Sequence, residues 1–192
     1  GIYVARDRYQ AGVEIPKQEI QVHELDMDPE LYPKQWEAYQ ILTKKSALVV
    51  DDMLAEEENK AVMPVLYMIA LITRQRQMVV WPAGIEFRHP TTKELLFKTD
   101  VVESVKIDYA TDLATQLIKD EQERVVLFSQ FKQPLIELER RLTDAGVRVI
   151  RYDGDTPDHI RQEIQIDFDR KYSSPNKPYK WDIVLGHYKT GG

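Results

Sequence analysis

Three apolar segments in the last third of the chain each end in a short polar cluster, and this pattern constrains the fold more than any other feature. The segments are residues 125–128, 147–152 and 183–185, and the residues between them have helical spacing. The order strand, helix, strand, helix, strand predicts a parallel sheet with helices on its faces. Ligands bind beyond the carboxyl ends of the strands in such sheets. We therefore expect the three polar clusters to lie along one edge.

The residues of these segments resemble a known family. The motifs are VVLFSQF at 125–131, RYDGDT at 151–156, DIVLG at 182–186 and KTGG at 189–192, preceded by VEIPKQE at 13–19 and LITRQRQ at 71–77. In this order they resemble the second, carboxyl-terminal motor lobe of the Swi/Snf-type helicase-like ATPases, in helicase superfamily two. The resemblance implies an α/β fold: a RecA-like parallel sheet flanked by helices, an incomplete P-loop NTPase-like lobe, with a helical protrusion.

The resemblance also implies roles for residues that follow the strands. The implied DNA-binding residues are Ser129, Gln130, Lys132, Gly154, Thr156, Lys189 and Thr190. Gly191 and Gly192 would line the ATP cleft, and no catalytic or metal-binding residue is expected in this chain. Each cluster also has a purely structural interpretation: a loop that satisfies its own amides at 129–130, a tight turn with a helix cap at 153–156, and a chain end at 189–192.

The implied function is that of one half of a motor. The carboxyl-terminal lobe of an ATP-dependent DNA translocase or helicase grips the backbone of double-stranded DNA and completes the ATP cleft with an amino-terminal lobe. ATP and Mg²⁺ are the cofactors implied for the full-length protein. Two alternatives remain open: a non-catalytic protein-interaction module of the same fold, and the motor subunit of a restriction or repair helicase.

The sequence lacks the phosphate-binding loop that such a motor needs. That loop reads glycine, four residues, then Gly-Lys and Ser or Thr, and no such segment occurs in the sequence. We therefore expect a truncated chain, without its first motor lobe, that holds no cofactor and has no ATPase activity by itself.

The composition limits other functions. A net charge of -6 counts against a protein that coats nucleic acid, so DNA binding would need a local basic track. The absence of cysteine excludes disulfides and thiolate sites, and four scattered histidines do not predict a metal site. No apolar run approaches the roughly 20 residues that span a bilayer, so we expect a cytoplasmic protein without a membrane partner. Candidates for the basic track are Lys132, Arg151, Arg161 and Lys189.

Spacing and turn residues predict four parts of the chain. Residues 1–27 would be an entry segment with the first strand of the lobe at 19–25, and residues 28–82 a protrusion of two helices, the first opened by Asp28. Residues 83–105 would be a loop with a short hairpin near 95–97, and residues 106–192 the lobe itself. Within the second helix, residues 74–77 are expected to be a surface feature, with a basic stripe that contacts nucleic-acid phosphates as the alternative.

Overall fold

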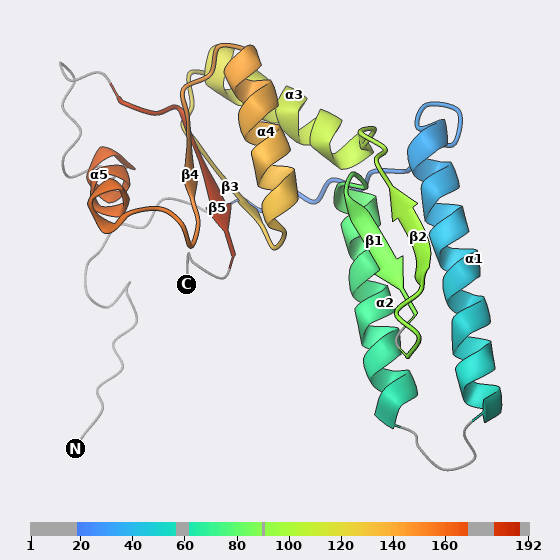
Figure 1. Ribbon diagram of the computed structural model, residues 1–192. Helices are drawn as coiled ribbons and strands as arrows, with labels where there is room; N and C mark the ends of the chain where they lie inside the picture. The colour runs from blue at the N-terminus through green and yellow to red at the C-terminus, as the bar shows by residue number, and fades with distance from the viewer. Residues whose placement is uncertain (1–18, 57–61, 90, 169–178, 189–192) are drawn as a thin grey trace, which may run out of the picture.

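The chain folds into a helical hairpin joined to a three-stranded parallel sheet (Figure 1). The computed structural model describes residues 19–56, 62–89, 91–168 and 179–188. Among these residues, no helix is long and apolar enough to cross a membrane.

Two long helices form the hairpin, as predicted for the protrusion. They are α1, Pro33–Glu56, and α2, Val62–Val80. Side chains at helical spacing on the two helices form one core with the small β hairpin that packs on them. The central members of this core are Leu42, Val49, Tyr67, Leu71 and Met78.

One face of α2 remains exposed although it is apolar. The exposed fractions of Val65, Met68, Ile69 and Ile72 are 48%, 38%, 56% and 55%. The helix carries apolar residues on two faces, and Tyr67, Leu71 and Met78 make the face that α1 covers. The apolar spacing that predicted the helix did not show which of these faces would be buried.

A small β hairpin lies across the two helices. Strands β1, Ile85–Arg88, and β2, Leu95–Thr99, pair antiparallel, which confirms the hairpin predicted near residues 95–97. Ile85, Phe87 and Phe97 point into the core shared with α1 and α2.

The predicted amino-terminal strand is wrong. Residues 19–28 form neither helix nor strand, and Ile20 and Val22 are each 80% exposed. Nothing among the described residues pairs with the outer edges of β3 and β4, so this segment does not extend the parallel sheet.

The first helix also begins later than Asp28. The carboxylate Oδ1 of Asp28 accepts a hydrogen bond from the Glu30 amide at 2.7 Å, so Asp28 closes a turn. Helix α1 then starts at Pro33, whose missing N–H costs nothing in a first turn.

The parallel sheet confirms the predicted RecA-like fold. Its strands are β3, Val125–Ser129, β4, Val149–Tyr152, and β5, Ile183–His187, in the order β3-β5-β4. Its helices are α3, Val105–Lys119, α4, Lys132–Asp144, and α5, Asp158–Phe168.

Helices cover both faces of this sheet. On one face, α3 and α4 pack on β5 through residues that include Ile107, Leu135, Leu142 and Ile183. On the other face, Ile164 of α5 packs against Val184 and Trp181. Helix α4 is followed by Gly146, whose φ of 79° suits a residue without a Cβ. The outer limits of the four predicted parts stay a prediction.

Buried polar contacts fix the hairpin to the sheet. The side chain of Gln35 is fully buried: Nε2 donates to the Met78 carbonyl at 3.0 Å, and Oε1 accepts from the Val105 amide at 3.1 Å. The Ser104 hydroxyl donates to the Val80 carbonyl at 2.7 Å and caps α3. Because buried polar groups are costly without partners, these bonds hold the end of α2 against the start of α3, and α3 in turn packs on α4.

Candidate functional site

The strand ends predicted to form a site do meet at one edge of the sheet. In the parallel register, Ser129 pairs with His187 and Tyr152 pairs with Gly186. The segments that follow β3 and β4 therefore leave the sheet at the same edge, one on each side of β5 (Figure 1).

Lys132 connects these two segments. It is the first residue of α4, and its ammonium Nζ contacts the carboxylate of Asp155 and lies 3.9 Å from Oδ2 of Asp153. The hydrogen bond with Asp155 raises the pKa of Lys132 and lowers the pKa of Asp155. Because the side chain of Asp155 is 80% exposed, an incoming phosphate could displace it from Lys132.

The loop at 153–156 satisfies much of its own polar backbone. Asp153 is 4% exposed; its amide donates to the Thr156 hydroxyl at 2.9 Å, and its Oδ1 accepts from the Asp155 amide at 2.9 Å. The Thr156 amide donates to the Asp153 carbonyl at 3.2 Å. Gly154 and Asp155, the two residues between them, are both exposed. DNA contacts by Gly154 and Thr156 stay predictions, and a contact by Thr156 would have to replace these bonds.

Two of the four candidates for the basic track support the loop instead. Arg161 donates from Nε to the Thr156 carbonyl at 2.8 Å and from Nη2 to the Asp153 carbonyl at 3.0 Å. Arg151 forms an ion pair with Glu139 at 2.6 Å and lies 3.4 Å from Asp153. Arg151 is therefore paired with carboxylates, and the guanidinium of Arg161 is engaged by backbone carbonyls of the loop.

The segment after β3 is anchored through its backbone and exposes Gln130. The Ser129 hydroxyl accepts from the Phe131 amide at 3.1 Å, and the Ser129 carbonyl accepts from the Tyr188 amide at 3.0 Å. Gln130 is exposed, and its Oε1 accepts a hydrogen bond from Nη2 of Arg76 at 3.2 Å. An arginine of the hairpin thus reaches the sheet edge, which sequence spacing could not show because 54 positions separate the two residues.

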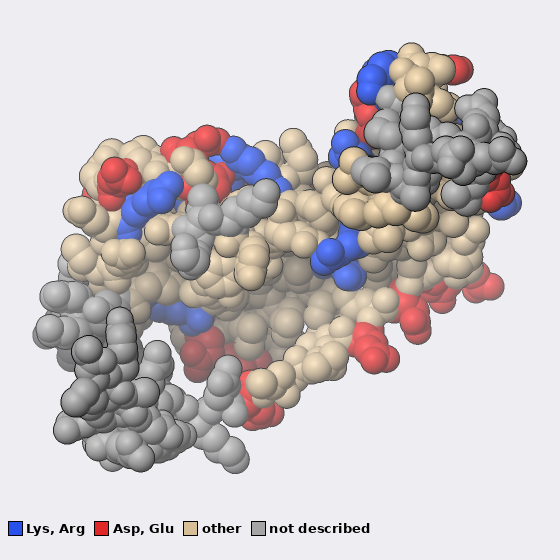
Figure 2. Space-filling model, turned by 90° about the horizontal axis from the view of Figure 1, so that it is seen from below, with Lys and Arg blue, Asp and Glu red and all other residues tan. Residues whose placement is uncertain are grey.

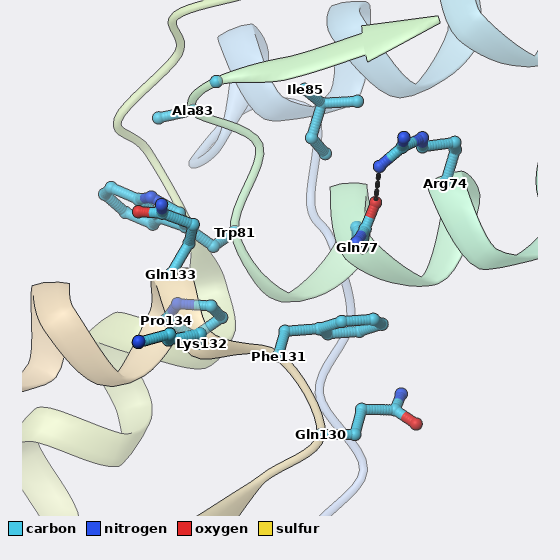
Figure 3. A pocket seen from close by; sticks show the side chains of 11 residues that line it. Arg74, Gln77, Trp81, Ala83, Ile85, Gln130, Phe131, Lys132, Gln133 and Pro134 are labelled. Atoms are coloured by element: carbon cyan, nitrogen blue, oxygen red, sulfur yellow. Dashed lines mark hydrogen bonds between the residues drawn. The ribbon is translucent and has the colours of Figure 1, made fainter. Parts of the chain in front are cut away.

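A cavity of about 310 Å³ opens between α2 and the start of α4. Figure 3 shows Phe131 between Gln130 and Lys132 on one wall, while Arg74 points toward Gln77 on the other, where Nη1 donates to Oε1 at 2.7 Å. Trp81, Ile85 and Pro134 contribute apolar walls. Residues 74–77 are expected from the sequence to be a surface feature, and the fold places Arg74 and Gln77 beside the predicted DNA-binding residues Gln130 and Lys132.

The last predicted residues cannot be placed. Lys189, Thr190, Gly191 and Gly192 lie outside the described residues. In the part that is described, no group of three or more histidine and acidic side chains is placed to hold a metal ion.

Charge is unevenly distributed on the face at this end of the molecule. Figure 2 shows basic groups over both the sheet part and the hairpin part of this face, with acidic groups beside several of them.

The sequence comparison and the structure comparison both find helicase-like ATPases. No family model matches the chain. It is 29% identical over 153 residues to the ATP-dependent helicase FUN30 of Saccharomyces cerevisiae, a match that covers 79% of this chain and 12% of the yeast protein.

Two solved structures share the fold. The crystal structure of the C-terminal part of the Fun30 ATPase domain matches with a TM-score of 0.54 and 18% identity, over 84% of this chain and 67% of that one. The Sulfolobus solfataricus SWI2/SNF2 ATPase core, solved in complex with double-stranded DNA, matches with a TM-score of 0.54 and 15% identity, over 82% of this chain and 29% of that one. The predicted resemblance is confirmed as a similarity: the chain is similar in sequence to the helicase FUN30, of which it spans about an eighth, and it shares the fold of the C-terminal part of the Fun30 ATPase domain.

Proposed function

We propose that this chain is the carboxyl-terminal motor lobe of an ATP-dependent DNA translocase or helicase. One observation carries the proposal: β3 and β4 end in register, so that Gln130, Lys132 and the loop at 153–156 converge on one edge of the sheet. The helicase named in the sequence comparison and the DNA-bound core named in the structural one support it.

The proposed edge grips the DNA backbone rather than reading bases. Lys132 supplies a cation, while Ser129, Gln130 and the exposed Gly154 supply small or polar groups that suit close approach of a phosphate. Since the chain has a net charge of -6, attraction for DNA must come from such local groups.

The ATP cleft would be shared with an amino-terminal lobe. Mg²⁺ bound with ATP would neutralise charge on the phosphates during transfer, and the loop that cradles those phosphates is missing from this sequence. Gly191 and Gly192 are the residues proposed to face that cleft. Full-length protein would therefore need both lobes for hydrolysis.

DNA binding by the edge is tested with fluorescent double-stranded DNA across a salt series. The variant Gln130→Ala, Lys132→Ala should bind at least about fivefold more weakly, and the slope of log K against log salt should fall by about 0.9, the value for one lost phosphate contact. Lys44→Ala is the matched control, because Lys44 is exposed on α1 and has no carboxylate partner within the described ranges. Equal binding by the double variant and the wild type would refute the edge as a DNA contact.

The proposal that two lobes share the ATP cleft is tested by measuring ATP hydrolysis. The purified chain should show no ATPase activity above background, with or without DNA, whereas a longer protein that includes a phosphate-binding loop should hydrolyse ATP. Turnover that follows this chain through purification and persists in independent preparations would contradict the proposal.

A second candidate is a non-catalytic interaction module of the same fold. The exposed apolar face of α2, with Val65, Met68, Ile69 and Ile72, favours it, because such faces are often covered by a protein partner. The complete gene separates the candidates: an upstream phosphate-binding loop supports the motor, and its absence supports the module. An appended nuclease sequence would instead support a restriction subunit.

A further inference from the structure

Four basic side chains from three helices gather around Gln130. Arg74 and Arg76 come from α2, Lys106 from α3 and Lys132 from α4; we call them the basic cluster. Arg74 and Lys132 line the 310 Å³ cavity together with Gln130. Arg76 and Lys106 line a neighbouring cavity of about 320 Å³, which Gln130 also borders. Gln130 therefore stands between two cavities that each carry two cations.

Carboxylates are missing from the walls of both cavities, as far as the described residues show. Within the basic cluster, Lys132 alone has carboxylate neighbours in the described part of the chain, Asp153 and Asp155. Arg74 bonds to Gln77 and Arg76 to Gln130, and both of these partners are neutral amides. The cluster thus keeps most of its positive charge.

This lack of acidic partners is unusual within this protein. Seven other arginines of the described ranges each lie within 4.0 Å of a carboxylate: Arg88, Arg124, Arg140, Arg141, Arg148, Arg151 and Arg161. In a chain with 32 acidic and 26 basic residues, pairing is easily achieved. Arg74 and Arg76 have no such partner among the described residues. They lie two positions apart on α2, a spacing at which side chains point to different sides of a helix, so each lines its own cavity.

An external anion would compensate these charges, which have only neutral amide partners. Guanidinium groups bind phosphate oxygens through two parallel N–H bonds, so two exposed arginines and two lysines suit a row of phosphates. The cluster is also continuous with Gln130 and Lys132 of the proposed DNA-binding edge. This continuity favours DNA over an acidic peptide as the ligand.

We propose that the basic cluster extends the DNA-binding surface from the sheet edge onto helix α2, where Arg74, Arg76 and Lys106 bind phosphates of double-stranded DNA. This inference rests on the proposed function. It adds a second DNA contact region, outside the strand-end motifs. In this region the end of the helical protrusion binds DNA.

The test uses the whole chain and fluorescent double-stranded DNA across a salt series. The variant Arg74→Gln, Arg76→Gln leaves Gln130 and Lys132 unchanged, and it should bind at least about tenfold more weakly with a salt slope lower by about 1.8. Lys34→Gln, Lys44→Gln is the matched control, since it removes two exposed charges from α1 of the same hairpin. Arg74→Lys, Arg76→Lys keeps the charge and should retain most of the salt slope.

The outcomes separate this inference from the proposed function. If the cluster variant binds like the α1 control while Gln130→Ala, Lys132→Ala loses affinity, the inference is overturned and the proposed function stands. If the wild type does not bind DNA even at low salt, both fail. If the cluster variant keeps DNA binding but loses binding to fluorescent polyglutamate, the ligand is an acidic peptide and the inference is wrong. Thermal unfolding of each variant confirms that it is folded.

Discussion

The ring of Phe128 lies directly over Gly186 of the neighbouring strand. A Cβ built on Gly186 would lie 2.4 Å from Cε1 and 2.5 Å from Cδ1 of the ring. The two residues are register partners in the β3–β5 pair, one position before Ser129 and His187. Although Phe128 is 57% exposed, its ring rests on the sheet, and the glycine leaves the space for it.

This contact predicts that Gly186→Ala destabilises the protein. The new methyl group must push the Phe128 ring toward solvent, so we expect a loss of about 1–2 kcal/mol in the free energy of unfolding, measured by urea denaturation. In Phe128→Ala, Gly186→Ala the clash is absent, and the combined loss should be smaller than the sum of the single losses. Additive losses would show that the ring and the glycine do not interact.

A second prediction concerns Arg124, which holds the segment before β5 against α5. Its guanidinium carbon lies 3.6 Å from the centre of the Phe168 ring and 4.0 Å from that of Tyr179, and Nη2 contacts the Asp167 carboxylate. Arg124→Ala should lower the free energy of unfolding by about 3 kcal/mol, because it leaves a partly buried carboxylate without its cation.

Arg140→Ala is the control for this loss. Arg140 also forms an ion pair, with Glu137, but its side chain is 59% exposed, against 18% for Arg124. Exposed pairs are worth about 0–1 kcal/mol. Urea denaturation should therefore separate the two variants clearly, and similar losses would contradict the account of Arg124.

A third prediction concerns the free energy of unfolding at acid pH. Asp182 accepts hydrogen bonds from the Arg148 amide at 2.9 Å and from its Nε at 3.0 Å, and these bonds lower the pKa of Asp182 below its ordinary value of 3.8. The unfolded chain therefore takes up this proton at higher pH than the folded chain. The stabilisation is present above about pH 3.8 and is lost as the pH falls through the folded-state pKa.

Asp182→Asn should remove this contribution. Its free energy of unfolding, followed by denaturant titration at several pH values, should lie below that of the wild type at neutral pH, and the difference should shrink below about pH 4. Asp144→Asn, at a side chain that is 67% exposed, is the control and should change stability little. A difference that stays constant with pH would show that the loss has another cause.

A fourth prediction concerns the exposed partner of Lys132. Asp155→Asn removes the carboxylate that now neutralises this lysine, so affinity for double-stranded DNA should rise, by about threefold at low salt. The same substitution combined with Lys132→Ala should give no rise. If Asp155→Asn raises affinity even without Lys132, the carboxylate acts through general repulsion of DNA and not through the ion pair.

The parallel sheet, and the edge at which its polar clusters meet, follow from the sequence alone. Apolar segments ending in polar clusters specify parallel strands, and local signals placed the helices between them: Gly146 follows α4, and α5 begins at Asp158 shortly after Thr156. These are interactions between near neighbours in the chain. The motifs on the same segments were enough to indicate the family.

Tertiary structure decided which surfaces are covered and which distant residues meet. The same apolar spacing could bury either face of α2, and α1 covers the face with Tyr67. Alternation at 19–25 predicted a strand, yet a strand needs a partner edge and none pairs with it among the described residues. Arg76 reaches Gln130 because buried Gln35 and Ser104 hold the end of α2 against the start of α3, which packs on α4. Contacts of this kind depend on packing between separate elements, which local sequence patterns do not encode.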